Sequence, residues 1–512
     1  MLSSLDTSHA ALARRYEEIP YDALPHRASH PARLASVAAL AGHAAPDVEH
    51  CSVLEVGCSD GSNLIPMAVA LPGARFVGCD LSAPGIEEGL RTIAALGLTN
   101  ITLVEGDLAA LGREHGGFDY IVAHGVYSWV PAHVRDALLA LAEERLAPAG
   151  ILYVSFNVLP GCRVRQAVWD VLHQHVDAIE DPRARLHAAR EVARLVGEAS
   201  PATLESDQAV RAEFRAVAQR SDSELYHDDL AVPNEPVLFH AFADHAARHG
   251  LRYLADADFP TLSLAGDASQ PPASLSTLDP IAREQYLDFV RLRRFRQALL
   301  VRVDAPSAPA AEPKRLRQLH VSASWELARG PLAGAVHKLA RRLDPASGGG
   351  GAMRKLLDAL VASHPATLPI ASLDRHVDVG ALAARLDAIL REAYEAGIVE
   401  LWVRPPPITI AAADRPLASP LARLQAGTRD RVTTLLHMAV SIADRSALQL
   451  LPLVDGTRDR AALVAAVRAL GIQKDPSQAT GFVDFALEKF ARLGLLMTTT
   501  ADHETGTRAV ES

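Results

Sequence analysis

VLEVGCSDGSN, residues 53–63, has the pattern of a buried strand that turns sharply into a helix. The first four residues are mostly apolar, and Gly57 follows them directly. A glycine after a buried strand lets the chain turn without a Cβ clash. Gly61, further along the loop, lets the backbone approach a ligand at the start of a helix. The stretch therefore predicts a nucleotide-like ligand held by a strand–loop–helix.

Strand and helix patterns alternate along the chain around this stretch. Short apolar runs predict strands at 51–56, 75–79, 101–104, 120–123 and 151–156. Helices are predicted between them, at 62–71, 84–96 and 131–146. Alternating units of this length specify a parallel sheet covered by helices on both faces. The predicted fold class is α/β, with a doubly wound, Rossmann-like sheet.

The chain after residue 160 predicts a helical insertion in the same sheet. Residues 163–248 are mostly helical, and later patterns predict a strand, a helix and a strand at 250–254, 280–293 and 298–303. One sheet domain over 51–303 with an insertion at about 163–248 explains this better than a new domain. We expect the insertion to serve regulation or dimerisation, and residues 1–50 to form an N-terminal helical lid.

Two winged-helix-like domains are expected at 315–405 and 415–500. Linker-like stretches lie at 304–314, 347–351 and 405–419. Residues 353–403 are helix-rich and end in GIVELWV, which is typical of a small helical core followed by a hairpin. Residues 443–497 repeat that theme, with a DGT turn at Asp455 and a terminal strand at 493–497. The polar segment 503–512 is expected to be disordered.

Composition and charge limit the class of protein. The chain has 512 residues, of which 49% are hydrophobic and 22% charged, and a formal net charge of −10. This acidic balance argues against a nucleic-acid partner. The sequence shows no secretory signal and no apolar run of the roughly 18–20 residues that span a membrane. The four cysteines form no CxxC pair, so we expect buried thiols in the cytoplasm rather than disulfides or a zinc site.

Acidic residues near the loop narrow the choice of ligand. Asp80 ends the second predicted strand, followed by Leu81, where a carboxylate reaches ribose hydroxyls in doubly wound folds. Glu55 would repel a pyrophosphate but suits an amino group, such as that of S-adenosylmethionine. A nicotinamide site prefers G-x-G-x-x-G, which Ser59 and Asn63 do not supply, and no G-K-[ST] of a Walker A loop follows.

A third acidic position follows the third predicted strand. Asp107 is placed to accept the adenine exocyclic amine, and Leu108 to pack on the ring; the other interpretation is a solvated loop aspartate. With Gly57, Cys58, Ser59, Gly61 and Asn63 of the loop, these residues predict S-adenosylmethionine as the cofactor.

The loop after the fourth strand should face the reactive methyl group, because ligands bind at the carboxyl ends of strands where the sheet order reverses. His124, Tyr127 and Trp129 are candidates for the acceptor pocket, as aromatic faces stabilise cations. Packing of Tyr127 and Trp129 in the core is the alternative. Asn157, just past the fifth strand, is a further polar candidate.

Residues 16–162 resemble the class I methyltransferases that carry a methyltransferase regulatory domain, and the resemblance extends over most of the chain. The segments that carry it are 16–21, 30–31, 57–68, 124–131, 155–157, 160–161, 234–236, 245–254, 285–289, 293–297 and 455–460. The best-characterised relatives are rickettsial protein lysine methyltransferases that act on an outer-membrane protein. Ser59 departs from the glycine common in this loop.

This resemblance implies methylation of lysine in a protein or peptide, a homodimer, and closure of Tyr16 or Tyr21 over the cofactor. His124 or water would take the proton of the lysine. A small-molecule methyltransferase and a non-catalytic cofactor-binding regulator remain alternatives. The C-terminal unit looks like modules that hold leader peptides, with DNA binding and structural packing as its other interpretations.

Overall fold

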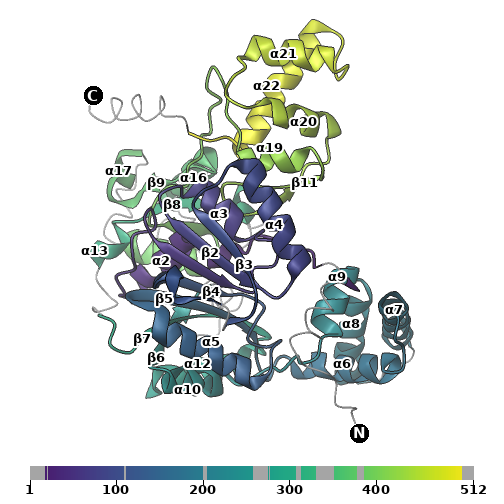
Figure 1. The fold of residues 1–512 in the computed structure, drawn as a ribbon. Coiled ribbons are helices and arrows are strands. Elements are labelled where there is room, and N and C mark those ends of the chain that lie inside the picture. The colour runs from purple at the N-terminus through teal and green to yellow at the C-terminus, as the bar shows by residue number, and fades with distance from the viewer. Residues whose placement is uncertain are drawn as a thin grey trace.

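The structure, a computed structural model, contains a mixed sheet of seven strands (Figure 1). It describes residues 18–19, 21–108, 111–199, 204–257, 275, 277–306, 313–329, 351–376 and 386–498. The strand order is β3-β2-β1-β4-β5-β7-β6, with β7 antiparallel to both of its neighbours. The strands are β1 (Ser52–Val56), β2 (Arg75–Asp80), β3 (Ile101–Glu105), β4 (Phe118–Ala123), β5 (Leu146–Asn157), β6 (Leu251–Asp256) and β7 (Phe295–Arg302). The order reverses between β1 and β4, so the predicted doubly wound α/β fold is confirmed.

Helices cover both faces of this sheet because its central strands β1, β4 and β5 are buried on both sides. On one face lie α2 (Pro31–Leu40), α3 (Leu64–Ala70) and α4 (Ala83–Leu96). On the other lie α5 (Ala132–Arg145), α10 (Phe239–Arg248) and α12 (Pro280–Arg291). The two faces bury separate apolar clusters, so the sheet is the rigid base on which the loops at its strand ends are held.

Strand β5 is longer than the sequence pattern predicts. The segment Pro148-Ala149-Gly150, whose composition is typical of a turn, precedes the strand predicted at 151–156 but lies inside β5. The pairing with β4 shifts register there, since Phe118 pairs with Leu146 but Tyr120 pairs with Ile151. The turn residues are accommodated as an irregularity within the strand rather than as its boundary.

The predicted helical insertion lies between β5 and β6. Its helices α6 (Arg163–Val176), α7 (Pro182–Glu198) and α8 (Glu205–Ala218) bury a cluster of their own and stand to the side of the sheet (Figure 1). After them, the short α9 (Asp222–Glu224) and the π-helical turn η4 (Leu225–Asp229) lead back towards the sheet. Ile19 from the N-terminal segment packs into the same cluster.

The segment after the sheet forms a small unit with its own core. Its strands are ordered β10-β8-β9 (Val399–Trp402, His320–Ala323 and Leu368–Pro369). Its helices are α13 (Pro313–Leu316), α14 (Trp325–Ala328), α16 (Gly351–Ser363), α17 (Leu373–His376) and α18 (Leu386–Glu395). The hairpin expected at 397–403 is not formed within that segment, because β10 pairs with β8, which precedes α14, α16, α17 and α18.

The last unit packs around a separate apolar cluster. It contains α19 (Pro420–Ala426), the hairpin β11 (Arg431–Thr433) and β12 (Ala439–Ser441), α20 (Arg445–Leu450), α21 (Arg460–Ala469) and α22 (Pro476–Arg492). The strand expected at 493–497 is reduced to bridges from Leu496 and Met497 to two distant residues, Ala418 and Ile408.

Two sequence-based expectations concern the chain as a whole. All four cysteines are buried thiols, as predicted. Among the helices that the structure describes, none combines the length and apolarity that crossing a bilayer requires. Residues 503–512, Tyr16 and most of the first two linker-like stretches lie outside the described residues.

Candidate functional site

A cavity of about 360 Å³ lies at the carboxyl ends of β1, β2, β4 and β5. This is the place where a doubly wound sheet binds its ligand. Most of the residues predicted for the site line it: Tyr21, Glu55, Gly57, Cys58, Ser59, Asn63, Asp80, Leu81, Asp107, Leu108, His124, Trp129 and Asn157. The predicted set therefore meets in one place, although it comes from six separate stretches of sequence.

Two predicted residues do not line this cavity. Gly61 has φ of +72°, and a Cβ there would lie 3.2 Å from both Ile65 and Leu103. Its glycine is needed for packing beneath the loop. The Tyr127 ring is only 3% exposed in the core behind β4, and its hydroxyl bonds His245 Nδ1 at 2.8 Å. The core-packing alternative describes Tyr127 better than the acceptor pocket.

Glu55 is the most unusual group in the cavity wall. Its side chain is buried, and Oε1 accepts a 2.7 Å hydrogen bond from Asn63 Nδ2. Oε2 is buried and has no hydrogen-bond partner among the residues that the structure describes. Burial raises the pKa of Glu55 to about 8, against the hydrogen bond from Asn63, which lowers it. An unpaired buried carboxylate oxygen is costly unless a ligand supplies a donor, and the ammonium group of S-adenosylmethionine is such a donor.

Asp80 fixes the loop that faces it. Its two carboxylate oxygens accept backbone N–H groups of Ser59 at 2.7 Å and Ser82 at 2.8 Å. Burial raises the pKa of Asp80, while these backbone donors oppose the rise. Each oxygen can accept a further hydrogen bond, so the carboxylate can still meet a ribose hydroxyl.

The backbone conformation of the loop explains why Gly57 is a glycine and why Ser59 is strained. Gly57 has φ of +75°, and a Cβ there would lie 2.9 Å from Val126. Ser59 has φ of +49°, in the left-handed region that favours glycine. Such a residue costs roughly 1–2 kcal/mol, and the bond from its N–H to Asp80 holds it there. The serine is thus strained in a conformation that glycine adopts without a Cβ penalty.

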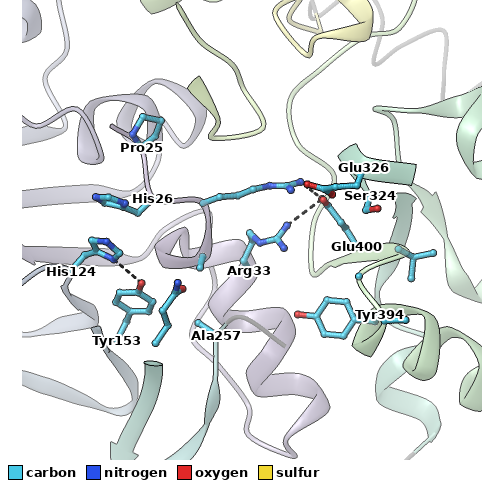
Figure 2. Close-up of a pocket in the computed structure, with 16 residues that line it drawn as sticks. Pro25, His26, Arg33, His124, Tyr153, Ala257, Ser324, Glu326, Tyr394 and Glu400 are labelled. Atoms are coloured by element: carbon cyan, nitrogen blue, oxygen red, sulfur yellow. Dashed lines mark hydrogen bonds and ion pairs between the residues drawn. The ribbon is translucent and has the colours of Figure 1, made fainter. Parts of the chain in front are cut away.

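His124 lines both this cavity and a second one, which Figure 2 shows. Its Nδ1 lies 2.8 Å from the Tyr153 hydroxyl, and its ring stacks on His26 with centroids 3.5 Å apart. Burial holds the pKa of His124 well below its usual range and lowers that of His26 to about 4. Both rings are therefore neutral at physiological pH.

The second cavity, of about 580 Å³, runs from His26 and His124 to the unit formed by β8 and β10. Figure 2 shows Tyr394 and Glu400 on that side and Tyr153 on the sheet side. Glu400 is buried and pairs with Arg27 and, at 3.2 Å, with Arg33. His26 and His124 line both cavities, so the two spaces adjoin at these rings.

The N-terminal segment crosses the site and is fastened at both ends. Near its start, the Ile19 carbonyl accepts from His227 Nε2 at 2.8 Å, and Asp22 N–H donates to Ser223 at 3.0 Å. Near its end, His26 N–H donates to Asn63 Oδ1 at 2.8 Å. Between them, Tyr21 lines the cofactor cavity, and burial raises its pKa to about 12.

Several residues of the cavity wall were not predicted from the sequence. They are His26, Arg165, Trp169, His227, Asp228, Arg294 and Phe295. All except His26 come from the insertion, the turn after it or the start of β7. Arg294 and Phe295 lie in segment 293–297, which carries the family resemblance, but the sequence assigned none of these residues a role at the site. An insertion that follows β5 directly has to pass close to the strand ends.

Family models match three parts of the chain. Residues 54–152 match a methyltransferase domain, 221–302 a predicted methyltransferase regulatory domain, and 414–480 the C-terminal winged helix domain of PKMT. The matched ranges cover the cofactor loop, the segment around α10 and the last unit described above.

Curated relatives are similar over part of the chain. An uncharacterized protein of Rickettsia prowazekii (strain Madrid E) is 36% identical over 291 residues, 56% of this chain and 53% of that protein. Another uncharacterized protein of the same organism is 29% identical over 240 residues, 47% of this chain and 96% of that protein. The chain thus spans about half the length of the first relative.

Solved structures share nearly the complete arrangement. PKMT2 from Rickettsia typhi in complex with AdoHcy has a TM-score of 0.78 at 23% identity, over 94% of this chain and 100% of that one. A second structure of PKMT2 from Rickettsia typhi has a TM-score of 0.79 at 24% identity, over 93% and 100%. At these identities the likeness shows a common fold, and it agrees with the domain types found by the family models.

Proposed function

We propose that this chain, a class I S-adenosylmethionine-dependent methyltransferase with a regulatory domain and a C-terminal winged-helix domain, N-methylates lysine side chains of a protein. The class and its cofactor follow from the fold and the matched domains. The acceptor is the part that we propose. One observation carries it: a second cavity adjoins the cofactor cavity at His26 and His124.

The second cavity suits a long side chain presented by a polypeptide. It lies between the sheet domain and the small unit that contains β8, β9 and β10, which we call the middle unit. Both contribute to its wall. Tyr153 lines it from the sheet side and Tyr394 from the other side (Figure 2), and both side chains are almost fully buried. A lysine entering from the middle unit would bring its nitrogen towards the shared rings, while the rest of its chain stayed outside.

The residues of the cofactor cavity have separate tasks. Glu55 would hold the ammonium group, Asp80 the ribose and Asp107 the adenine, with Leu108 against the ring. Bound there, S-adenosylmethionine supplies a methyl group on a sulfonium, which leaves as a neutral thioether when an amine attacks in line. The protein then has to align the two centres and exclude water.

The acceptor must be neutral before it can react. The inner end of the second cavity, where the buried rings of His26 and His124 meet, favours the uncharged amine, because burial disfavours the ammonium form. His124 is neutral, since burial holds its pKa well below its usual range. It is therefore suited to hydrogen-bond and orient the amine, and water is the better final acceptor of the proton.

The full chain, a bacterial lysate and S-adenosylmethionine labelled in its methyl group test this proposal. Proteins and small molecules are separated after incubation, and each fraction is searched for label. We expect label on lysate proteins after incubation with the wild-type chain, and no label on them after incubation with the Asp80→Ala variant. Label only in small molecules would favour the small-molecule alternative, and label in neither would favour a non-catalytic regulator.

We also propose that the chain self-associates and that it is cytoplasmic. The first proposal is a homodimer, which the family resemblance implies. The four free thiols support a reducing, cytoplasmic location.

A further inference from the structure

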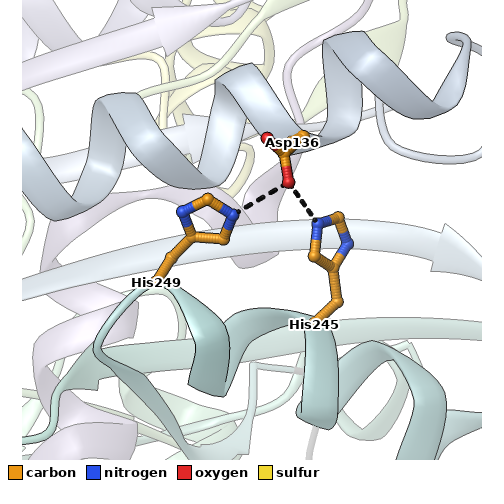
Figure 3. Close-up of side chains that lie close together, drawn as sticks. All are labelled: Asp136, His245 and His249. Atoms are coloured by element: carbon orange, nitrogen blue, oxygen red, sulfur yellow. Dashed lines mark hydrogen bonds and ion pairs between the residues drawn. The ribbon is translucent and has the colours of Figure 1, made fainter.

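Two histidines and an aspartate meet outside the cofactor cavity, between α5 and α10 (Figure 3). His245 and His249 are four residues apart on α10 and its end, so both rings lie on one side of the helix. Asp136 faces them from α5. Its Oδ1 lies 3.3 Å from His245 Nε2 and 3.1 Å from His249 Nε2. Neither the cofactor nor the proposed acceptor path uses these groups.

The spacing of these three atoms matches a metal site. A tetrahedral zinc ion binds nitrogen and oxygen ligands at about 2.0–2.2 Å, which places neighbouring ligand atoms about 3.4 Å apart. The two measured nitrogen–oxygen distances, 3.1 and 3.3 Å, are within a few tenths of an ångström of that value. All ligand atoms lie within 4.8 Å of one another, so a small movement of the rings would admit an ion.

The far nitrogen of each ring is also held. His245 Nδ1 lies 2.8 Å from the Tyr127 hydroxyl, and His249 Nδ1 lies 3.4 Å from Glu143 Oε2. Metal-bound histidines regularly use their second nitrogen in this way, because a partner there fixes the ring and its tautomer. The Tyr127 hydroxyl can act as acceptor when Nδ1 carries the proton.

We propose that His245, His249 and Asp136 bind a divalent transition-metal ion of the zinc type. Two imidazoles and one carboxylate suit zinc, cobalt or nickel, and not magnesium or calcium, which prefer oxygen ligands. Three protein ligands leave a further position for water or another donor. The ion is structural or regulatory, since the ligands stand apart from the two cavities.

An ion at this place would connect two parts of the chain and affect a loop of the cofactor cavity. His245 and His249 belong to the segment that matches the regulatory-domain model, and Asp136 belongs to the sheet domain. A bound ion would fasten these parts together. It would also hold Tyr127, two residues before Trp129 in the wall of the cofactor cavity.

A cluster of ion pairs without a metal is the competing account. Asp136 is exposed, Glu143 lies beside His249, and the positive charge of Arg248 acts on His245. Hydrogen bonds alone could hold these groups at the same distances. The two accounts differ in whether the chain retains a metal ion.

Tag-free full chain is loaded with Zn²⁺, and separately with Co²⁺, exchanged into metal-free buffer and measured for retained metal. We expect one ion per chain in the wild type, with Co²⁺ giving visible absorption bands of a histidine-ligated site. His249→Gln and His245→Gln should lose the retained ion. Tyr127→Phe should keep the ion but weaken its affinity by about 10- to 100-fold.

His50→Gln is the matched control, because His50 sits in an exposed group with Asp47 and Glu49 that could hold an ion adventitiously. It should retain the full equivalent. Circular dichroism of each variant checks that the chain is folded. Absence of retained metal in the wild type, or equal retention in wild type and His249→Gln, would establish an ion-pair cluster and overturn the proposal.

Discussion

Glu55 is a buried carboxylate whose charge and burial favour a cationic ligand. Its position two residues before the first loop glycine excluded a phosphate ligand on charge alone. The structure adds that one carboxylate oxygen is bonded by Asn63 and the other has no partner. The same burial that raises its pKa to about 8 makes a cationic partner strongly favourable.

Replacing Glu55 by glutamine should weaken binding of S-adenosylmethionine by about 10- to 100-fold. A hydrogen bond to a charged group contributes about 1.5–3 kcal/mol, and the amide cannot supply the charge. Isothermal calorimetry on the full chain measures this. Glu87→Gln, on the exposed side of α4, is the control and should bind as the wild type. Wild-type affinity in Glu55→Gln would remove Glu55 from the site.

Cofactor binding at pH 7 should also release close to one proton. Glu55 is protonated below its pKa of about 8, and an ammonium beside it favours the ionised carboxylate, so the proton leaves. The release should decline as the pH rises through 8, where the free protein has already lost this proton. Calorimetry in buffers of different ionisation enthalpy counts the protons; a release that persists in Glu55→Gln would assign it elsewhere.

Ser59 is a non-glycine residue of the loop that adopts a left-handed backbone conformation. Ser59→Gly should leave the stability unchanged or raise it slightly, because relief of roughly 1–2 kcal/mol is opposed by a glycine entropy of roughly 0.5–1 kcal/mol. Ser59→Val should lower the melting temperature, since a β-branched residue fits this conformation poorly. Thermal unfolding checks both; a large loss in Ser59→Gly would mean that the hydroxyl itself stabilises the loop.

The two aromatic residues of the loop between β4 and α5 lie in different surroundings: Tyr127 in the core and Trp129 in the cavity wall. The spacing of Tyr127 and Trp129 did not reveal which ring faces the ligand, because alternation in a loop has no fixed period. In the structure Tyr127 packs in the core, and Trp129 lines the cavity with its indole nitrogen buried and unpartnered.

Trp129→Ala should reduce the turnover rate at least tenfold while changing cofactor affinity much less. We propose that the ring, which lines the cofactor cavity, shapes the space beside the reactive methyl group, where misplacement costs rate through lost alignment. Trp129→Phe keeps the ring but not the N–H, so it separates shape from hydrogen bonding. Single-turnover assays with calorimetry measure both quantities, and unchanged turnover in Trp129→Ala would place the acceptor elsewhere.

The main strands and helices of the sheet were predictable because their apolar patterns match buried parallel strands and covering helices. The irregular start of β5 was not, since a Pro-Ala-Gly sequence favours a turn and only the pairing with β4 overrides it. The short hairpin β11–β12 was also missed: three-residue strands leave almost no periodic signal.

Contacts between distant parts of the chain were beyond prediction from the sequence, because no local pattern records them. Asn63 is the best example. It was predicted as a loop residue, and its Oδ1 accepts from His26 N–H and from His437 Nε2, both at 2.8 Å. His437 lies in the turn between β11 and β12, so the winged-helix domain reaches the residue that holds Glu55.

His437→Ala should therefore weaken cofactor binding by about 2- to 10-fold, although His437 lies outside the sheet domain. Loss of one buried hydrogen bond costs about 0.5–1.5 kcal/mol and frees Asn63. Arg431→Ala is the control in the same hairpin, because its contact with Asp22 is exposed and contributes little. Equal affinities in the two variants would mean that the winged-helix domain does not support the cofactor loop.

Identification of the methylated atom tests the lysine proposal most directly. Proteins labelled by the full chain with S-adenosylmethionine are digested, and fragment masses locate each added methyl group. The account predicts methyl groups on lysine ε-nitrogens, abolished by Asp80→Ala and strongly reduced by Trp129→Ala. Methyl groups on other atoms, or only on small molecules, would contradict it.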